Sequence, residues 1–129
     1  MVNNWRCLVL DDEPLAIDVI EKYLQRVNIT DIHRCENPVE AFRLISSQQF
    51  HLVFLDIEMP VLTGLELLKS IKDPPGIIIS TAYREYAVEG FEFEVLDYLV
   101  KPIPFPRFMK AMERAMKTSR SITPPAETS

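Results

Sequence analysis

Short apolar runs alternate with longer stretches of helical period along most of this chain of 129 residues. The runs HLVFL at 51–55 and GIII at 76–79 are nearly continuous, which is typical of parallel strands buried on both faces. Parallel strands need crossover connections, and helical crossovers cover both faces of a sheet. The sequence therefore predicts a doubly wound α/β domain. The expected strands are 7–10, 29–35, 51–55, 76–80 and 95–100, and the expected helices are 14–27, one that starts at 38, 64–72, 84–89 and 105–118.

Two of the expected helices carry clear local signals. The helix at 38 starts with Asn37 as its cap, Pro38 at the first helical position and Glu40 three residues after the cap. The helix at 14–27 places its apolar side chains on one stripe, which consists of Ala16, Val19, Ile20, Tyr23, Leu24 and Val27. The first segment is therefore predicted to begin a helix at residue 38, and the second to pack its apolar stripe against the sheet.

Composition and charge exclude several classes of protein. The formal net charge of -5 argues against a general affinity for nucleic acid or anionic membrane. Two cysteines, Cys7 and Cys35, without a Cys-x-x-Cys pair, favour neither a disulfide framework nor a metal centre. The first residues lack the apolar run of a signal peptide, and no stretch approaches the ~18 apolar residues of a membrane span. We therefore expect a cytoplasmic protein.

The C-terminal segment differs in composition from the rest of the chain. Residues 118–129, TSRSITPPAETS, are rich in Ser, Thr and Pro and have no apolar anchor, which indicates a flexible linker. We accordingly expect one domain at 1–117 and a linker at 118–129 that leads to a further domain outside this sequence.

Polar side chains follow four of the expected strands at the points where these strands end. Asp11-Asp12-Glu13 follows the first strand, and Asp56 follows the third. Ser80-Thr81 ends the fourth strand, and Lys101-Pro102 comes directly after the fifth. In open parallel sheets the ligand site lies beyond the carboxyl ends of the strands. We therefore expect these groups to meet at one edge of the sheet.

The gathered charges predict phosphoryl chemistry. The carboxylates of Asp11, Asp12 and Asp56 would repel one another, so they ionise together only with a cation between them. An all-oxygen cluster suits a hard ion, and Mg²⁺ fits a site that also handles phosphate. Mg²⁺ and the Lys101 ammonium would neutralise the acids and the incoming phosphoryl oxygens. Asp56 is then a nucleophile able to form an acyl phosphate, and Thr81 can donate a hydrogen bond to a phosphoryl oxygen.

Each of these residues also has an ordinary structural interpretation. The acidic run before Pro14 could merely favour a helix N-terminus, and Asp56 could cap a turn. Lys101 could be an exposed loop residue, and Thr81 could be a satisfied turn hydroxyl. Chance rarely places all four groups at strand ends together, so the phosphoryl site is the preferred interpretation.

The same residues resemble the receiver domains of two-component response regulators. The matching segments are LVLDDEP at 8–14, LDIEMP at 55–60 with GLELL at 64–68, ISTAY at 79–83, and DYLVKP at 97–102. The stretch TAYREYAVEGF at 81–91 is similar to the subgroup with a LytTR-type (LytR/AlgR-like) output domain. The resemblance implies a flavodoxin-like, doubly wound five-stranded parallel sheet of order 2-1-3-4-5 with five helices.

The resemblance also implies how the site binds its ligands. Asp56 matches the phosphoacceptor, which takes its phosphoryl group from a sensor histidine kinase. Asp12 and Asp56 match direct Mg²⁺ ligands, Asp11 matches a ligand that acts largely through water, and the backbone carbonyl of Glu58 matches a further ligand. Such a domain promotes its own phosphoryl transfer and dephosphorylation, but it is a switch and not a turnover enzyme.

A second set of positions matches the family's switch. Thr81 and Lys101 match the pair that contacts the phosphoryl group, and Tyr98 matches the aromatic side chain that moves inward when Thr81 moves. The Lys101–Pro102 bond resembles the family's usual cis peptide. Phosphorylation is then expected to remodel the face made by the fourth helix, the fifth strand and the fifth helix, and thereby to control a DNA-binding transcription regulator domain.

Charged residues of both signs are expected on that face, and they allow two interpretations. One is an ordinary solvated surface, and the other is a symmetric homodimer with ion pairs across the subunits. The acids are Glu85, Glu89, Glu92, Glu94 and Asp97, and the bases of the last helix are Arg107, Lys110, Arg114 and Lys117.

Three rival functions fit the sequence less well. An aspartyl-phosphate phosphatase would carry its nucleophile after the first strand and would need a cap over the substrate. A receiver-like scaffold without phosphorylation would lack an acid, the Thr or the Lys. A flavin carrier would need a first loop rich in Gly and hydroxyl groups. His33 and His51 are expected to lie away from the pocket.

Overall fold

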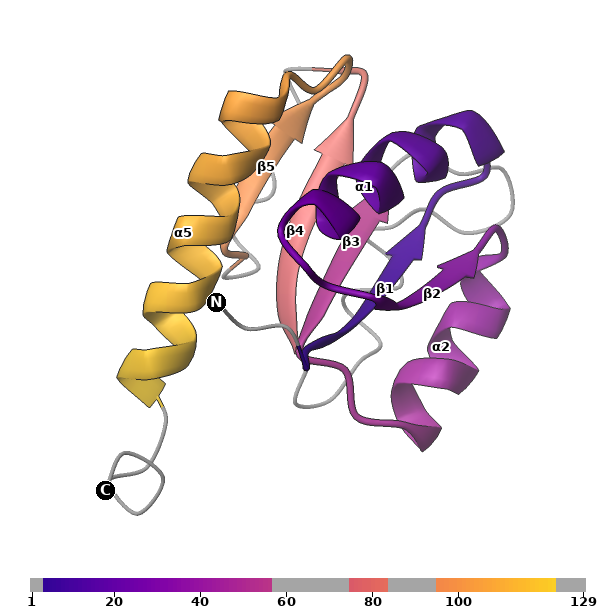
Figure 1. Cartoon of the computed structure of the whole chain (residues 1–129). Coiled ribbons are helices and arrows are strands. Elements are labelled where there is room, and N and C mark those ends of the chain that lie inside the picture. Colours follow the sequence, from indigo (N-terminus) through magenta and orange to yellow (C-terminus); the bar gives the residue numbers. More distant parts are fainter. Residues whose placement is uncertain (1–3, 57–74, 84–94, 123–129) are drawn as a thin grey trace.

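The computed structural model describes residues 4–56, 75–83 and 95–122 (Figure 1). These residues form a five-stranded parallel sheet of order β2-β1-β3-β4-β5, as predicted. Three helices accompany the sheet within these ranges, and the helices expected at 64–72 and 84–89 lie outside the described residues. The elements are β1 Arg6–Leu10, α1 Pro14–Arg26, β2 Asp31–Cys35, α2 Pro38–Ser47, β3 Leu52–Asp56, β4 Gly76–Thr81, β5 Asp97–Val100 and α5 Phe105–Ile122.

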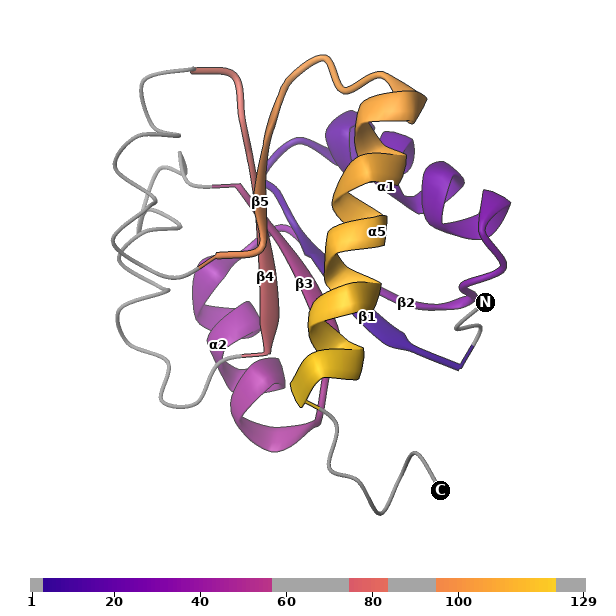
Figure 2. The same ribbon diagram turned by 90° about the vertical axis from the view of Figure 1, so that its left-hand side faces the viewer.

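The helices cover both faces of the sheet. Figure 2 shows α1 and α5 on one side and α2 on the other. Because side chains alternate along a strand, Cys7 and Val9 of β1 point to the side of α1 and α5, whereas Leu8 and Leu10 pack on the side of α2. The central strand β3 is buried along its whole length. This two-sided burial explains the continuous apolar runs in the sequence.

The apolar stripe of α1 differs from the predicted one. Ile17, Ile20, Leu24 and Val27 are buried, while Val19 is 40% exposed. The buried positions follow one another at helical spacing, and Val19 lies beside this stripe and not within it. Asn28 follows the helix with a positive φ of 67°, a conformation that Asn tolerates after a helix end.

The other helix limits follow from local chemistry. Asn37 caps α2, since its side chain accepts hydrogen bonds from the backbone N–H groups of Val39 and Glu40 at 2.8 and 3.2 Å. Helix α5 continues to Ile122, beyond the expected end at residue 118. The predicted linker therefore begins inside this helix, and residues 123–129 lie outside the described part. In the described part of the chain, none of the helices has the length and apolar character that crossing a bilayer would require.

Candidate functional site

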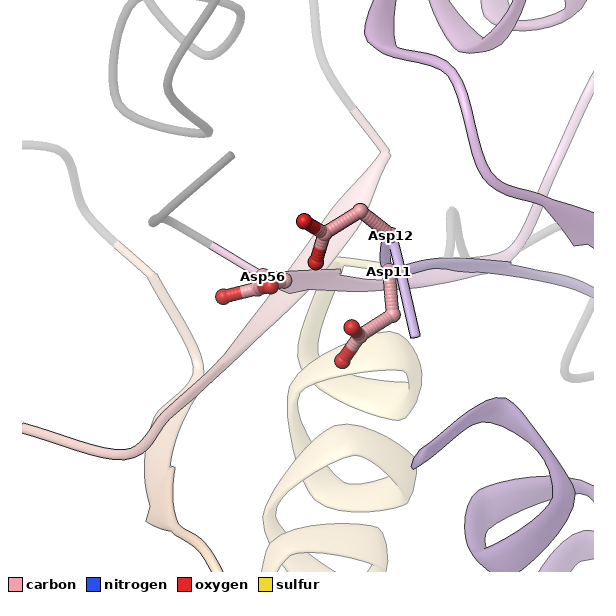
Figure 3. Close-up of side chains that lie close together, drawn as sticks. All are labelled: Asp11, Asp12 and Asp56. Carbon is pink, nitrogen blue, oxygen red and sulfur yellow. The ribbon is translucent and has the colours of Figure 1, made fainter. Parts of the chain in front are cut away.

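Three aspartates meet where two neighbouring strands end. Asp11 and Asp12 follow β1 directly, and Asp56 is the last residue of β3, which pairs with β1 in the sheet. Figure 3 shows the three side chains gathered at these two strand ends. One carboxylate oxygen from each residue lies within 4.8 Å of the others. Asp11 and Asp56 are only 1% and 4% exposed, so water screens their repulsion weakly.

Lys101 brings a positive charge to the aspartates. Its Nζ lies 2.6 Å from Asp11 Oδ2 and 3.8 Å from Asp56 Oδ2. Burial alone would lower the pKa of Lys101, but the hydrogen bond to Asp11 and the charges of Asp56, Asp11 and Glu13 outweigh it and raise this pKa above its usual value. The lysine is therefore an ammonium at neutral pH. Asp11 also accepts a hydrogen bond of 3.0 Å from the backbone N–H of Glu13, which fixes its carboxylate.

The charge of this cluster suits a divalent cation. Three carboxylates and one ammonium give the cluster a formal charge of minus two, and two of its aspartates, Asp11 and Asp56, are buried. The donors are all oxygens, which are the ligands that Mg²⁺ prefers. Asp11, Asp12 and Asp56 form an acidic triad of the kind that holds Mg²⁺.

Thr81 ends β4, the strand next to β3. Its side chain is buried, and its hydroxyl oxygen accepts a hydrogen bond of 3.0 Å from the backbone N–H of Tyr83. Its carbonyl oxygen accepts a hydrogen bond of 2.7 Å from the N–H of Lys101, so the end of β4 holds the chain just after β5. The Lys101–Pro102 peptide bond is cis. Asp11, Asp12, Asp56 and Lys101 thus come together, Thr81 ends the adjacent strand, and Glu58 lies outside the described residues.

Tyr98 lies in β5 on the side of the sheet that α2 covers. Its side chain is partly buried and packs against the apolar cluster that includes Val53 and Ile79. Burial, helped by the negative charge of Asp97, raises the pKa of the Tyr98 phenol. The phenol is therefore neutral at physiological pH, which allows the ring to pack against apolar side chains.

The structure corrects the expected position of Asp97. This residue was expected on an exposed acidic surface, but it is only 3% exposed and bound by two arginines of α5. Arg107 donates two hydrogen bonds to its carboxylate, at 2.7 and 2.9 Å, and a third to the carbonyl oxygen of Tyr98 at 3.0 Å. Arg114 donates one at 3.2 Å. The seven-residue spacing of these arginines on one helix face is the only signal in the sequence that could have suggested a shared partner.

Burial and ion pairing act in opposite directions on Asp97. Burial would raise the pKa of its carboxyl group. The hydrogen bonds from Arg107 and from the backbone N–H of Tyr98, together with the charges of Arg107 and Arg114, outweigh burial and lower this pKa. Asp97 is therefore an ionised, structural acid that joins β5 to α5.

Residues 7–113 match the family described as the response regulator receiver domain. The chain belongs to this family. A receiver is a phospho-accepting signalling switch, and membership implies a cognate histidine kinase. The expectation of a switch rather than a turnover enzyme is confirmed.

Several relatives agree with the LytTR-type resemblance. The chain is 40% identical to an uncharacterised response regulatory protein of Shewanella oneidensis, over 93% of this chain and 51% of the relative. It is 37% identical to the sensory transduction protein LytT of Bacillus subtilis, over 91% and 50%. It is 32% identical to the transcriptional regulatory protein LytR of Staphylococcus aureus, over 88% and 48%. The receiver thus spans about half the length of these relatives.

Solved receivers share the fold. TrrA of Thermotoga maritima, determined in complex with Mg(2+)-BeF, is 33% identical with a TM-score of 0.77, over 86% of this chain and 98% of that one. The receiver domain of a Francisella response regulator is 26% identical with a TM-score of 0.77, over 89% and 99%. The Mg²⁺ in TrrA agrees with the Mg²⁺ expected at the aspartates of this chain.

Proposed function

We propose that Asp56 accepts the phosphoryl group from a sensor histidine kinase, in a reaction that needs Mg²⁺. One observation carries this proposal: the buried Asp56 carboxylate ends β3 beside Asp11, Asp12 and the Lys101 ammonium. A carboxylate beside an ammonium and a bound cation is able to act as a nucleophile. The alternative carboxylates are less suitable, since Asp11 is held by Lys101 and by the N–H of Glu13.

In the proposed reaction, an Asp56 oxygen forms a bond to phosphorus while the bond between phosphorus and the kinase's histidine nitrogen breaks. The imidazole nitrogen keeps the electron pair of the broken bond. Mg²⁺, when bound to Asp11, Asp12 and Asp56, supplies positive charge that offsets the phosphoryl oxygens. The backbone carbonyl of Glu58 is proposed as a further Mg²⁺ ligand, although it lies outside the described residues.

Two further side chains would contact the phosphoryl group. The Lys101 ammonium is close enough to Asp56 to pair with an oxygen bound to it. The Thr81 hydroxyl group has a long hydrogen bond of 3.4 Å to the carbonyl oxygen of Tyr83, which a phosphoryl oxygen could replace with a stronger, charge-assisted one. Thr81 would then move toward the phosphate.

The movement of Thr81 is proposed to act through Tyr98. The Tyr98 ring is partly buried beside the same sheet edge, so space vacated by Thr81 could be filled by this ring. Conversion of a mostly inactive population to a mostly active one needs about 5 kcal/mol of differential stabilisation, which several charge-assisted contacts can supply. The remodelled face would include β5 and α5 together with the helix expected at 84–89.

We further propose that this face controls a LytTR-type DNA-binding domain that follows the receiver. The relative LytR is called a transcriptional regulatory protein, and the matched region is about half of it. In this arrangement 1–117 is the receiver, and 118–129, whose first residues continue α5 to Ile122, leads to the C-terminal domain that contacts DNA. The net charge of -5 favours this division. We also propose a cytoplasmic location for the whole protein. We also propose that two copies form a homodimer through the face made by the helix expected at 84–89, β5 and α5.

Intact-mass measurement tests the phosphoacceptor. The receiver is incubated with Mg²⁺ and acetyl phosphate, and the mass gain of one phosphoryl group is followed with time. We expect the gain in the wild type, no gain in Asp56→Asn, and a normal gain in Asp18→Asn, which changes an aspartate paired with Arg34 on the surface. An equal gain in wild type and Asp56→Asn would place the phosphoryl group elsewhere and refute the assignment.

A further inference from the structure

The sheet order places the backbone of Lys101 far to the side of the aspartates that its side chain reaches. Strand β5 is separated from β3 by one strand and from β1 by two. At the usual spacing of neighbouring strands, the end of β5 lies about 10 Å from the end of β3 and about 14 Å from the end of β1. A lysine stem of four carbons covers only part of such a gap, so the direction of the backbone at its root decides whether the ammonium reaches the aspartates. The contact between Lys101 and Asp11 therefore depends on what fixes the loop between β5 and α5.

This loop is held on both sides of Lys101. On the side of β5, the backbone N–H of Lys101 donates a hydrogen bond of 2.7 Å to the carbonyl oxygen of Thr81. On the side of α5, Ile103 is buried among side chains of α1 and α5. Its carbonyl oxygen accepts a hydrogen bond of 2.7 Å from the hydroxyl of Tyr23. Tyr23 belongs to α1, so the second attachment comes from a different element, 80 residues away in the sequence.

Tyr23 is itself rigidly placed. Its ring meets Phe105 edge-on at 5.1 Å between centroids and Phe108 at 5.2 Å, which joins it to the first turn of α5. The guanidinium of Arg26, one turn further along α1, lies 3.8 Å above the Phe105 ring. These contacts add stability and fix the direction of the Tyr23 hydroxyl.

Helix α1 also connects directly to the acidic side of the pocket. It begins at Pro14, and the residue before it, Glu13, donates its N–H to Asp11. One continuous helix therefore has its start beside the aspartates and its last turns bound to the loop that carries the lysine. Helix α1 therefore helps to position both Asp11 and Lys101, which carry opposite charges.

We propose that Tyr23 is a positioning residue for phosphoryl transfer: its hydrogen bond to Ile103 holds the loop so that the Lys101 ammonium reaches the pocket. The inference rests on the proposed role of Lys101 at the phosphoryl group. Tyr23 does not contact the reacting atoms, and its effect passes through the backbone of residues 101–103.

Tyr23→Phe tests this inference, because it removes the hydroxyl and keeps the ring. The rate of mass gain with Mg²⁺ and acetyl phosphate is expected to fall about three- to tenfold, the range that one neutral hydrogen bond can account for. Ile77→Val is the matched control, since it shortens a buried side chain on the other face of the sheet, at the start of β4. This control is expected to lose stability and to keep the wild-type rate.

A double-mutant cycle separates positioning from general weakening. Lys101→Met should slow phosphorylation, and Tyr23→Phe should then cause no further loss, because the side chain that it positions is gone. A wild-type rate in Tyr23→Phe, or the same fold loss with and without Lys101, would overturn the positioning role while leaving Asp56 as the phosphoacceptor. Absence of any mass gain in the wild type would instead refute the proposed function on which the inference rests.

Discussion

Asp11, Asp12 and Asp56 are held together by a fold that tolerates their repulsion. The strand ends fix their backbones, and the Lys101 ammonium offsets part of their charge. Such an arrangement costs stability in the absence of a cation and gains it when a cation binds. The three carboxylates should therefore couple metal binding to the free energy of unfolding.

Mg²⁺ is expected to stabilise the receiver, because it binds the gathered carboxylates of the native state and not the dispersed ones of the unfolded chain. At one hundred times its dissociation constant the gain is about 2.7 kcal/mol. Asp12→Ala should lose most of this gain, and Glu36→Ala, which changes an exposed acid outside the pocket, should keep it. Urea unfolding with and without Mg²⁺ measures the difference, and an equal gain in both variants would contradict a site at Asp12.

Trp5 provides the signal for such unfolding experiments. It is the single tryptophan of the chain, it is buried, and its ring stacks on His51 at 5.9 Å between centroids. Trp5 directly precedes β1 and His51 directly precedes β3, so both lie at the end of the sheet opposite the aspartates. Its fluorescence should therefore report unfolding and respond little to Mg²⁺ itself.

Asp97 should make the stability of the receiver depend on acid pH. Its pKa is lowered from the usual 3.8, so its stabilisation is fully present above pH 3.8 and is lost as the pH falls through the folded-state pKa. Asp97→Asn should lower the free energy of unfolding by about 1–3 kcal/mol at neutral pH, the range for a hydrogen-bonded buried group that loses its partners.

Urea unfolding of the wild type and of Asp97→Asn across this pH range tests the assignment. The difference between them should shrink below pH 3.8, because the wild-type carboxyl group then becomes neutral as well. Asp18→Asn is the control. Asp18 pairs with Arg34 on the surface, so this substitution should lower the free energy of unfolding by less. A difference between wild type and Asp97→Asn that stays constant with pH would exclude ionisation of Asp97 as its cause.

At the scale of elements, the contact between β5 and α5 depends unequally on two arginines. Arg107→Ala removes two hydrogen bonds to Asp97 and one to Tyr98, and it should cost about 2–3 kcal/mol. Arg114→Ala removes one longer bond from a side chain that is mostly exposed, and it should cost less than about 1 kcal/mol. Lys110→Ala is the control, because it changes an exposed residue of the same helix. Equal losses of unfolding free energy in the two arginine variants would show that both arginines bind Asp97 equally.

The elements themselves were largely predictable from periodicity and caps. The five apolar runs gave strands whose limits differ from the structure by a few residues, and Asn37 and Pro38 marked the start of α2 correctly. The predicted apolar stripe of α1 included Val19 in place of Ile17. Both residues are apolar, and only the packing on the sheet distinguishes them. The end of α5 was placed too early, because the Ser- and Thr-rich composition after residue 118 resembles a linker.

Only those site residues that directly follow an apolar strand could be predicted from the sequence. The aspartates and Lys101 follow apolar runs, so the rule for parallel sheets brings them together. The pairing of Asp97 with Arg107 and Arg114 depends on how α5 crosses β5, and no local pattern contains that angle. The same holds for the hydrogen bond from Tyr23 to Ile103, whose partners belong to distant segments.

At the scale of the whole molecule, the sheet separates two different ends. The carboxyl ends of its strands carry the acidic pocket, while the opposite end carries Trp5, His51 and the ion pair of Arg6 with Asp31. His33 lies in the middle of β2, where it contacts Asp31 and Phe50. A phosphoryl group at Asp56 would thus act on the loops and helices at one end and leave the other end unchanged.

The proposed dimer belongs to this scale, and the structure narrows which charges could support it. Arg107 and Arg114 already bind Asp97 within one copy, whereas Lys110 is exposed on α5. Lys110→Glu should therefore weaken a dimer formed through α5, without changing the rate of phosphorylation. Arg43→Glu, the same charge reversal on α2 at the other face of the sheet, should leave the dimer intact.

Light scattering over a range of concentrations, with and without Mg²⁺ and acetyl phosphate, measures the association. We expect the phosphorylated wild type and Arg43→Glu to double in mass at lower concentrations than Lys110→Glu, because a charge on α5 that faces a second copy changes affinity and one on α2 does not. A phosphorylated wild type that keeps its monomer mass well above micromolar concentration would leave α5 as an ordinary solvated face. In that case the switch would act on its output domain within a single chain.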